Sequence, residues 1–405
     1  MTLGRAWDLL ENLIDVLAPH CPMLDAIERA GDARRFCPLV SSLVVVARAA
    51  DPAVAVACIA TLPALGAIVF RTPRRVIAEF QGHEVDIRVA TPDEYGTVLF
   101  TTTGPPAHVA ATLKRHGPRL SANEADVYAQ AGLTYLPPER RDAPDAIDLA
   151  RGRPLDPAVS RADIRGDLHM HTTYSDGRDP LHTMVAAAAA LGYEYIAITD
   201  HSEHAATSRT LNRDRLKRQA DEIAELRERV PGMAILHGIE ADILSDGTVD
   251  CPDAVLASLD IVLASLHERY GHDGTRLTER CLRAIRHPLV SIITHPTNQL
   301  VGRRPAYDMD YERLYAEAAA TGTILEIDGA PAHLDLDSVR ARAAVAADVT
   351  VSIDSDCHRA SALARQMQFG IGIARRAGIG AAHVANTRPL PGLKALLARK
   401  RARAC

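Results

Sequence analysis

The chain has 405 residues, of which 47% are hydrophobic and 24% charged, which excludes a disordered protein and suits two or three packed domains. A net charge of −5 excludes the global positive field that holds nucleic acid without sequence preference. Seven cysteines without a Cys-x-x-Cys pair predict neither a disulfide framework nor a thiolate zinc site. Because no leader pattern and no apolar run of bilayer length occur, we expect a cytoplasmic protein without membrane contact.

The first part of the chain predicts a small α+β domain over residues 1–135. Apolar residues at helical spacing predict an amphipathic helix from about residue 9, ending near Pro19. Strands are predicted at residues 42–47, 67–70 and 84–89, and a turn at residues 101–106 is followed by a helix through Leu113. Residues 136–163 are rich in proline and charge and have little hydrophobic period, so they predict a linker.

Residues 164–405 predict a domain of repeated strand and helix units. Asp179 and Pro180 predict the start of a helix that runs to Leu191 and is closed by Gly192. Short apolar runs alternate with helical patterns, and with the segment leading into His169 they make seven strands: 195–199, 234–239, 261–266, 290–294, 323–327 and 349–353. A parallel barrel of seven or eight strands is the simplest solution, and the rival open doubly wound sheet lacks its glycine-rich phosphate turn.

Residues able to bind a metal follow most of these strands. His169 and His171 are two apart on extended backbone, so both imidazoles leave the same face. One such pair alone is weak evidence, but the carboxyl ends of barrel strands meet at one rim, where nine ligands converge. These candidate metal ligands are His169, His171, Asp176, His201, Glu240, His267, His295, Asp356 and His358.

Nine nitrogen and oxygen ligands exceed the needs of one ion and indicate two or three divalent ions, with Zn, Mn and Fe all compatible. Neighbouring ions can share a bridging hydroxide that attacks a phosphoester, and amide or lactone hydrolysis uses similar centres. Arg269, Arg303 and Arg304 follow strand-end ligands and are candidates to contact an anionic substrate, although a solvated basic loop explains them equally well. Among the other histidines, His204 and His333 are the candidates to line the pocket.

Residues 164–397 resemble the PHP (polymerase and histidinol phosphatase) metallophosphoesterases, especially the PHP domain of bacterial family X DNA polymerases. The resemblance is carried by residues 165–172, 175–177, 198–202, 250–267 and 355–358. It implies an α/β fold with a distorted (β/α)7 barrel and the complete family ligand set. One ion would take His169, His171, Glu240 and Asp356, a second would share Glu240 and use His267 and His295, and a third would use Asp176, His201 and His358.

Two departures from this resemblance concern the substrate. Asn298 and Gln299 stand where glycine and arginine are expected, and His333 replaces an expected arginine and is interpreted as its partial substitute. The N-terminal part resembles a truncated polymerase palm and thumb, through residues 30–35, 84–89 and 103–104, without the preceding DNA-binding regions. An expected pair of catalytic acids falls near residues 41–44, where no acid stands, so Asp86 alone cannot hold two Mg ions and polymerisation is inferred to be lost.

The sequence therefore predicts a multinuclear metal-dependent phosphoesterase that acts through a metal-bridging hydroxide, with Glu240, His201 and Arg303 as catalytic candidates. The predicted substrate is either a DNA 3′ end, processed in the 3′-to-5′ direction, or a small phosphomonoester. A non-catalytic DNA-binding repair scaffold is the alternative from another class, for which Arg34, Arg35, Arg74 and Arg75 would supply the contacts. Neither the native metal nor the oligomeric state follows from the sequence.

Overall fold

A computed structural model describes residues 1–115, 119–152, 155–205 and 209–402. The chain forms two compact units, Met1–Pro157 and Ala158–Cys405. The boundary between them lies inside the predicted linker, of which residues 153–154 fall outside the described part. The linker prediction needs one correction, because η1 (Pro138–Arg140) and α7 (Ala146–Arg151) are helical. Leu136, Ala146 and Ala150 pack in a core cluster of the first unit, which places residues 136–151 within that unit.

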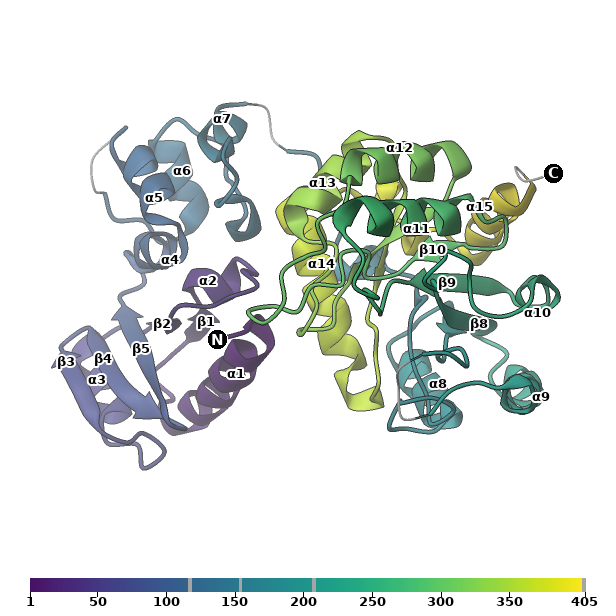
Figure 1. Cartoon of the computed structure of the whole chain (residues 1–405). Helices are drawn as coiled ribbons and strands as arrows, with labels where there is room; N and C mark the ends of the chain where they lie inside the picture. The colour runs from purple at the N-terminus through teal and green to yellow at the C-terminus, as the bar shows by residue number, and fades with distance from the viewer. Residues whose placement is uncertain (116–118, 153–154, 206–208, 403–405) are drawn as a thin grey trace. The chain divides into compact units, whose positions relative to one another are not determined.

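The first unit contains a five-stranded mixed sheet in the order β1-β2-β5-β4-β3, drawn in blue and purple in Figure 1. Its strands are β1 (Ala26–Arg29), β2 (Leu43–Arg48), β3 (Ile68–Thr72), β4 (Arg75–Phe80) and β5 (His83–Ala90). Only β2 and β5 run parallel, in a register that places Val44 beside Asp86. The valine run of β2 is buried because β2 is an inner strand, between β1 and β5.

Helices cover this sheet and extend the unit: α1 (Leu3–His20), α2 (Gly31–Arg34), α3 (Pro52–Ile59), α4 (Tyr95–Thr103), α5 (Pro106–Leu113) and α6 (Glu124–Gln130). The buried residues Leu3, Leu10 and Leu17 of α1 are seven apart and form one apolar stripe. The helix ends one residue after Pro19, close to the predicted end. The turn predicted at residues 101–106 is shorter than expected, because α4 continues to Thr103 and α5 begins at Pro106.

The second unit is a parallel barrel. Its strands follow one another around the sheet in sequence order: β6 (Gly166–Asp167), β7 (Tyr195–Ile198), β8 (Ala234–Asp242), β9 (Ile261–Ser265), β10 (Ile292–Ile293), β11 (Ile324–Asp328) and β12 (Val351–Asp354). A parallel bridge between Met170 and Cys357 joins the segments that follow the two outer strands, and the His171 amide donates to the Cys357 carbonyl at 2.9 Å. The predicted distorted (β/α)7 barrel after an α+β region is thereby confirmed.

Helices surround the barrel strands in Figure 1. They are α8 (Leu181–Ala190), α9 (Arg213–Arg229), α10 (Asp253–Ala257), α11 (Gly274–Arg286), α12 (Tyr311–Thr321), α13 (Ser338–Ala346), α14 (Leu363–Ala377) and α15 (Leu390–Ala402). Alternate strand residues such as Ile261 and Leu263 form one buried cluster, to which α15 adds Leu393 and Leu397. Because this cluster and the helices hold the strands rigidly, the loops that follow the strands can carry a site.

The start of α8 and the absence of a membrane-spanning segment were also predicted. Helix α8 begins one residue after Pro180, but the predicted cap Asp179 does not cap it, because its carboxylate accepts the amide of Ala360 at 2.8 Å. Within the described residues, none of the helices combines the length and the apolarity needed to cross a membrane.

Candidate metal centre

The structure brings all nine predicted ligands together at one end of the barrel. Glu240 lies on β8, near its carboxyl end, and the other eight lie in segments that follow β6, β7, β9, β10 and β12. Their ligand atoms fall into four overlapping groups, each within 4.8 Å: His171, Asp176, His201 and His358; His169, His171 and Asp356; His169, Glu240 and His295; and His201, Glu240 and His267. Convergence from so many strands follows from the parallel barrel, since all its strands end at the same rim.

Glu240 lies at the middle of these groups and is fully buried. Its Oε1 is 2.9 Å from His295 Nε2 and 3.2 Å from His267 Nε2, while its Oε2 is 2.9 Å from His201 Nδ1. Burial alone would raise the pKa of this carboxyl, but the facing histidines, first His201, then His267 and His169, hold it well below its usual value. Glu240 is therefore an ionised carboxylate with both oxygens turned toward imidazoles.

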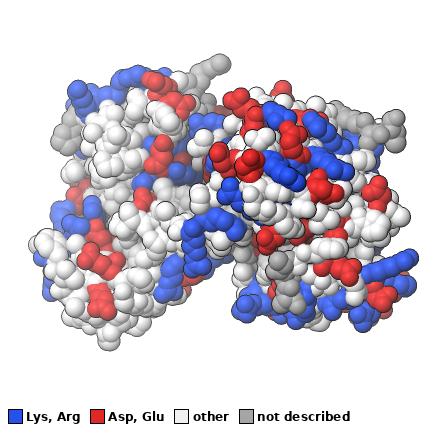
Figure 2. Space-filling view, in the orientation of Figure 1, with Lys and Arg blue, Asp and Glu red and all other residues white. Residues whose placement is uncertain are grey.

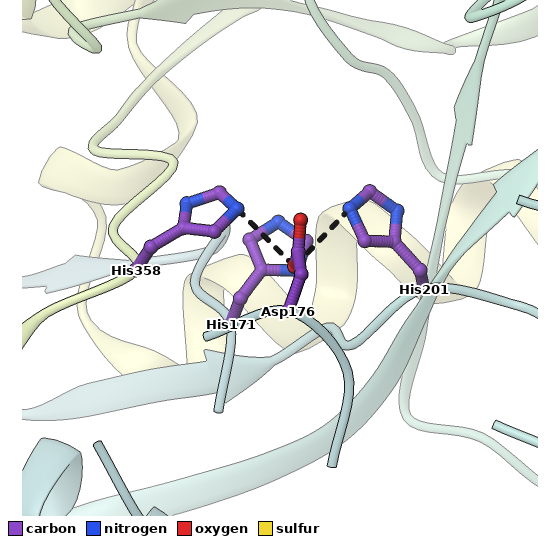
Figure 3. A group of neighbouring side chains, drawn as sticks. All are labelled: His171, Asp176, His201 and His358. Atoms are coloured by element: carbon purple, nitrogen blue, oxygen red, sulfur yellow. Dashed lines mark ion pairs between the residues drawn. The ribbon is translucent and has the colours of Figure 1, made fainter. Parts of the chain in front are cut away.

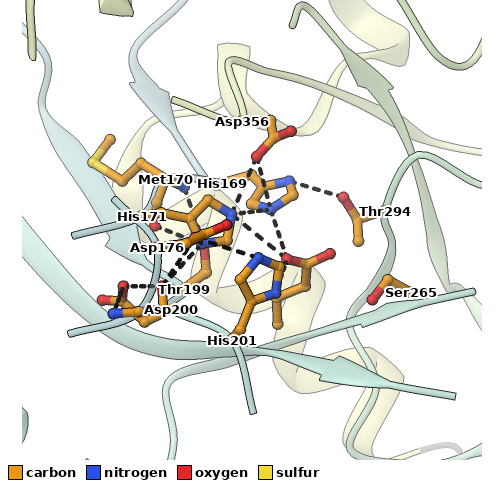
Figure 4. Close-up of polar contacts among 12 residues, drawn as sticks. His169, Met170, His171, Asp176, Thr199, Asp200, His201, Ser265, Thr294 and Asp356 are labelled. Carbon is orange, nitrogen blue, oxygen red and sulfur yellow. Dashed lines mark hydrogen bonds and ion pairs between the residues drawn. The ribbon is translucent and has the colours of Figure 1, made fainter. Parts of the chain in front are cut away.

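His169 and His171 form the pair that the sequence placed on one face. Their Nε2 atoms lie only 3.0 Å apart, and Asp356 Oδ1 is 3.1 Å from His171 Nε2 and 3.6 Å from His169 Nε2 (Figure 4). Burial, together with His358 and His201, lowers the pKa of His171 to about 3, so this ring is neutral at neutral pH. Two ring nitrogens facing one carboxylate oxygen are a suitable donor set for a cation.

Asp176 organises a second cluster at the rim, in which its carboxylate lies between two imidazoles (Figure 3). Asp176 Oδ1 is 3.3 Å from His358 Nε2 and 3.5 Å from His201 Nε2, and the His171 ring stacks on both neighbouring histidines. Burial raises the pKa of Asp176, but hydrogen bonding to His201 and His358 outweighs it and lowers this pKa strongly. The short loop after β6 thus supplies ligands to three of the four groups, through His169, His171 and Asp176.

Three of the histidines are oriented by an acceptor behind the ring. His169 Nδ1 lies 2.7 Å from Glu326 Oε1, and His267 Nδ1 lies 2.5 Å from Asp242 Oδ1. His358 Nδ1 lies 2.9 Å from the backbone carbonyl oxygen of Asp356. In each case an Nδ1–H can donate to the oxygen, which leaves Nε2 with a free lone pair turned toward the site.

Sequence reasoning missed the two carboxylates of this outer layer. Glu326 lies in the fully buried strand β11, and an acid between the apolar residues Leu325 and Ile327 was the available signal. Asp242 lies two residues after Glu240, where the period of a strand puts it on the same face.

The buried polar atoms of the site fit metal ions better than they fit each other. Glu240 Oε2 and His201 Nδ1 are 2.9 Å apart, yet among the described residues neither has a partner in hydrogen-bond geometry, and His295 Nδ1 also lacks one. Buried polar atoms without partners are costly. Mixed imidazole and carboxylate donors are the ligands that Zn, Mn and Fe accept, so these residues can hold such ions.

Two of the three arginines that were predicted to contact an anionic substrate bind other groups of the protein. Arg303 is exposed on a turn, and its side chain has no polar partner among the described residues. Arg304 donates instead to the carbonyl and amide oxygens of Asn298 at 2.8 and 2.5 Å. Asn298 in turn donates to the carbonyls of residues 266 and 267, and Gln299 donates to those of residues 333 and 334. Asn298 and Gln299 therefore hold the rim loops together, and Arg269 bonds the carbonyl of residue 272.

The two histidines proposed to line the pocket also differ from each other. His204 is largely exposed and pairs with Asp250 at 2.8 Å, outside all the candidate metal groups of the described residues. His333 is half-buried and stacks on His295, with ring centroids 5.4 Å apart. Of the two, only His333 lies beside the nine ligands.

Comparison with known proteins supports a family assignment. A PHP domain model matches residues 167–326, a range that contains the ligands from His169 to His295 and ends before Asp356 and His358. The DNA polymerase/3′-5′ exonuclease PolX of Bacillus subtilis is 34% identical over 399 residues, which are 92% of this chain and 68% of that protein. The chain belongs to the PolX family of PHP-domain proteins.

Other known proteins match about half of the chain. A probable phosphatase of Syntrophotalea carbinolica is 31% identical over 209 residues, which are 49% of this chain and 82% of that protein. The solved histidinol phosphate phosphatase of Lactococcus lactis, in complex with zinc, L-histidinol and phosphate, is 18% identical and covers 53% of this chain and 94% of its own, with a TM-score of 0.41.

Proposed function

We propose that this protein is a metal-dependent phosphoesterase that removes nucleotides or phosphate from DNA 3′ ends. The observation that carries the proposal is the convergence of nine histidine, aspartate and glutamate side chains on one barrel rim, with Glu240 in the middle. Families of hydrolases use such centres for phosphoesters, because neighbouring divalent ions activate water and neutralise the charge on phosphate oxygens.

In the proposed centre, His169, His171 and Asp356 would hold one ion, His267 and His295 would hold a second, and Glu240, whose oxygens face all four of these histidines, would serve both. Asp176, His201 and His358 hold the third. His169, His171 and His201 each belong to two of the groups, and we assign each of them to one ion because a neutral imidazole normally binds one ion through one nitrogen. Zn, Mn and Fe all suit this donor set.

The exposure of the ligands indicates where substrate approaches. The side chains of His169, His171 and Glu240 are fully buried, whereas those of Asp176, His267 and His358 are 26%, 23% and 35% exposed. A phosphate therefore reaches the centre from the side of these three residues, with the buried ligands behind it. Arg303 remains a candidate substrate contact, since its exposed side chain is not engaged elsewhere in the described structure.

The choice of DNA over a small ester rests on the extent of the family match. The PolX relative aligns with 92% of the chain, so with both units, whereas the phosphatase relative aligns with about half. The small-molecule phosphatase remains the second candidate, because all the proposed metal ligands lie in the PHP unit.

Loss of polymerase activity is part of the proposal. Asp86 is bound by Arg75 and Arg88 through contacts of 2.8–3.1 Å, and its neighbour on the parallel strand β2 is Val44. A carboxylate neutralised by two guanidinium groups, with a valine at its partner position on β2, is a poor ligand for the paired Mg ions of nucleotidyl transfer.

A DNA-binding scaffold without catalysis has less support. Its four candidate arginines are all engaged in ion pairs, Arg34 with Glu124, Arg35 with Asp142, Arg74 with Glu94 and Arg75 with Asp86. On the face seen in Figure 2, basic and acidic side chains are interspersed.

The deciding experiment offers the protein two substrates in parallel, a single-stranded oligonucleotide labelled at its 5′ end and a panel of small phosphomonoesters, each with Mn²⁺ or Zn²⁺ or a chelator. We expect metal-dependent shortening of the oligonucleotide from its 3′ end. Turnover of the monoesters alone would favour the second candidate. Salt-dependent DNA binding that survives the chelator, without turnover of any substrate, would favour the scaffold.

A further inference from the structure

One more histidine and one more aspartate lie at the edge of the nine-residue centre without a role in it. Asp328 is the last residue of β11, and His333 lies in the loop that follows. Ligand atoms of Asp328, His333 and Asp356 all lie within 4.8 Å of one another. We propose that these three residues form an additional divalent-cation site beside the main centre.

The backbone holds Asp328 and His333 in this arrangement. The loop after β11 turns back on itself, so that Asp335 forms an antiparallel bridge with Asp328 and donates its amide to the Asp328 carbonyl at 3.2 Å. Within the loop the His333 amide donates to the Ala330 carbonyl at 2.9 Å. Gln299 fastens the loop from outside by donating to the His333 carbonyl at 3.0 Å. His333 is thus held in place by main-chain hydrogen bonds.

The polar atoms at this place lack partners. Asp328 is fully buried, and its Oδ1 accepts the Ala330 amide at 2.6 Å, while its Oδ2 has no hydrogen-bond partner in the described structure. The buried Nδ1 of His333 is likewise without one. Two residues whose ligand atoms lie within 4.8 Å of each other thus each carry a buried polar atom without a partner, and a bound cation would satisfy such atoms.

The donor set indicates which cation fits. The group has two carboxylates and one imidazole, whereas the group of His171, Asp176, His201 and His358 has three imidazoles and one carboxylate. Oxygen-rich sites suit Mn²⁺ and Mg²⁺, and nitrogen-rich sites suit Zn²⁺ and Fe²⁺. The additional site therefore takes an exchangeable Mn²⁺ or Mg²⁺ ion, which the protein binds more weakly than the ions of the main centre.

This inference rests on the proposed metal centre, because Asp356 belongs to both sites. It differs from that proposal in one respect that can be measured, since the additional ion depends on Asp328 and His333 and the main centre does not. His333 stacks on His295, so an ion held there lies beside the main centre and adds positive charge for a phosphate.

The test counts ions without relying on turnover. Full-length protein is loaded with Zn²⁺, passed through a desalting column and titrated with Mn²⁺, while free Mn²⁺ is followed by electron paramagnetic resonance and bound zinc by elemental analysis. The variants are Asp328→Asn and His333→Gln, which keep the size of each side chain. His204→Gln is the matched control, because His204 pairs with Asp250 outside the candidate groups.

We expect the unchanged protein and the control to bind one Mn²⁺ per chain in addition to zinc. Both Asp328→Asn and His333→Gln should weaken this binding at least tenfold and leave the zinc content unchanged. Equal Mn²⁺ binding by all four proteins, or no Mn²⁺ binding beyond zinc, would overturn the inference. Loss of zinc from either variant would overturn it as well, because that residue would then serve the main centre.

The half-buried His333 gives a usable variant if Asp328→Asn does not fold. Hydrolysis of the oligonucleotide is measured on the same zinc-loaded samples before Mn²⁺ is added. Hydrolysis without an additional Mn²⁺ site would leave the proposed function standing and remove only the inference. Binding of the additional Mn²⁺ without any hydrolysis would support the inference and count against the proposed function.

Discussion

The two units differ in the side chains that surround a carboxylate on a central strand. In the first unit Asp86 on β5 is bound by the guanidinium groups of Arg75 and Arg88. In the PHP unit Glu240 on β8 has five histidine rings within 3.5 Å of its carboxylate oxygens, those of His169, His171, His201, His267 and His295. An arginine stays protonated at neutral pH, so a carboxylate that it binds is not available to a metal ion. An imidazole can release its proton and then bind the metal ion together with the carboxylate.

The largest effect should come from removing the carboxylate at the middle of the rim. Glu240→Ala takes away the oxygens shared by two proposed ions, so we expect hydrolysis to be abolished and at least one ion per chain to be lost. The matched control is Asp86→Ala in the first unit, which should leave the rate within about twofold, because Asp86 is not among the proposed metal ligands and is already bound by Arg75 and Arg88. Rates are measured on the labelled oligonucleotide and metal content by elemental analysis. Unchanged metal content and rate in Glu240→Ala would refute the assignment.

A smaller loss of metal affinity should follow from removing a carboxylate that orients a metal-binding histidine. Glu326→Gln keeps the size of the side chain but removes the charge that holds the Nδ1 proton of His169. Outer partners of metal-binding histidines typically contribute about 10–100-fold in metal affinity, and we expect a loss in that range, measured by competition with a chelator. Glu317→Gln, which removes a surface ion pair with Arg286, is the control and should change nothing. Equal affinities in the two variants would place Glu326 outside the metal centre.

The third prediction concerns the stability of the first unit. The Arg141 side chain is fully buried and donates to Glu124 at 2.6 Å. Arg141→Met leaves the buried Glu124 with Arg34 as its remaining partner. We therefore expect the free energy of unfolding to fall by about 3 kcal/mol, near the lower end of the range observed when one partner of a buried ion pair is removed. Urea unfolding measures it, with the exposed Arg151→Met as a control that should cost less than about 0.5 kcal/mol. Hydrolysis per folded molecule should stay the same.

The fourth prediction concerns how the stability of the same unit depends on pH. Burial, with the nearby Arg141 charge, lowers the pKa of His108 from 6.5 to about 4. Between these pH values the unfolded chain binds a proton that the folded unit does not, so the free energy of unfolding falls as the pH is lowered through this window. His108→Gln should flatten the dependence between pH 6.5 and 4, and His83→Gln should preserve it. Parallel curves for both variants would contradict the prediction.

Much of the fold was predictable because local patterns and tertiary structure agree. The apolar runs of the second unit gave seven strands whose limits lie within a few residues of those observed. The predicted linker was wrong for residues 136–151, because short helices with few apolar residues, such as α7, gain their stability from the core they join. The predicted cap at Asp179 was also wrong because of a tertiary contact, since its carboxylate accepts a hydrogen bond from an amide 181 residues away.

The sequence by itself determined which side chains are available for metal binding, because histidines and acids recur at the ends of parallel strands whose direction is dictated by the repeated strand and helix units. Only the tertiary structure decided how those side chains are paired. Glu326 and Asp242 orient histidines from distant strands or turns, Arg75 closes Asp86 to metals, and the loop after β11 brings His333 back to Asp328. These contacts depend on the register and closure of the sheets, and neither residue spacing nor composition encodes them.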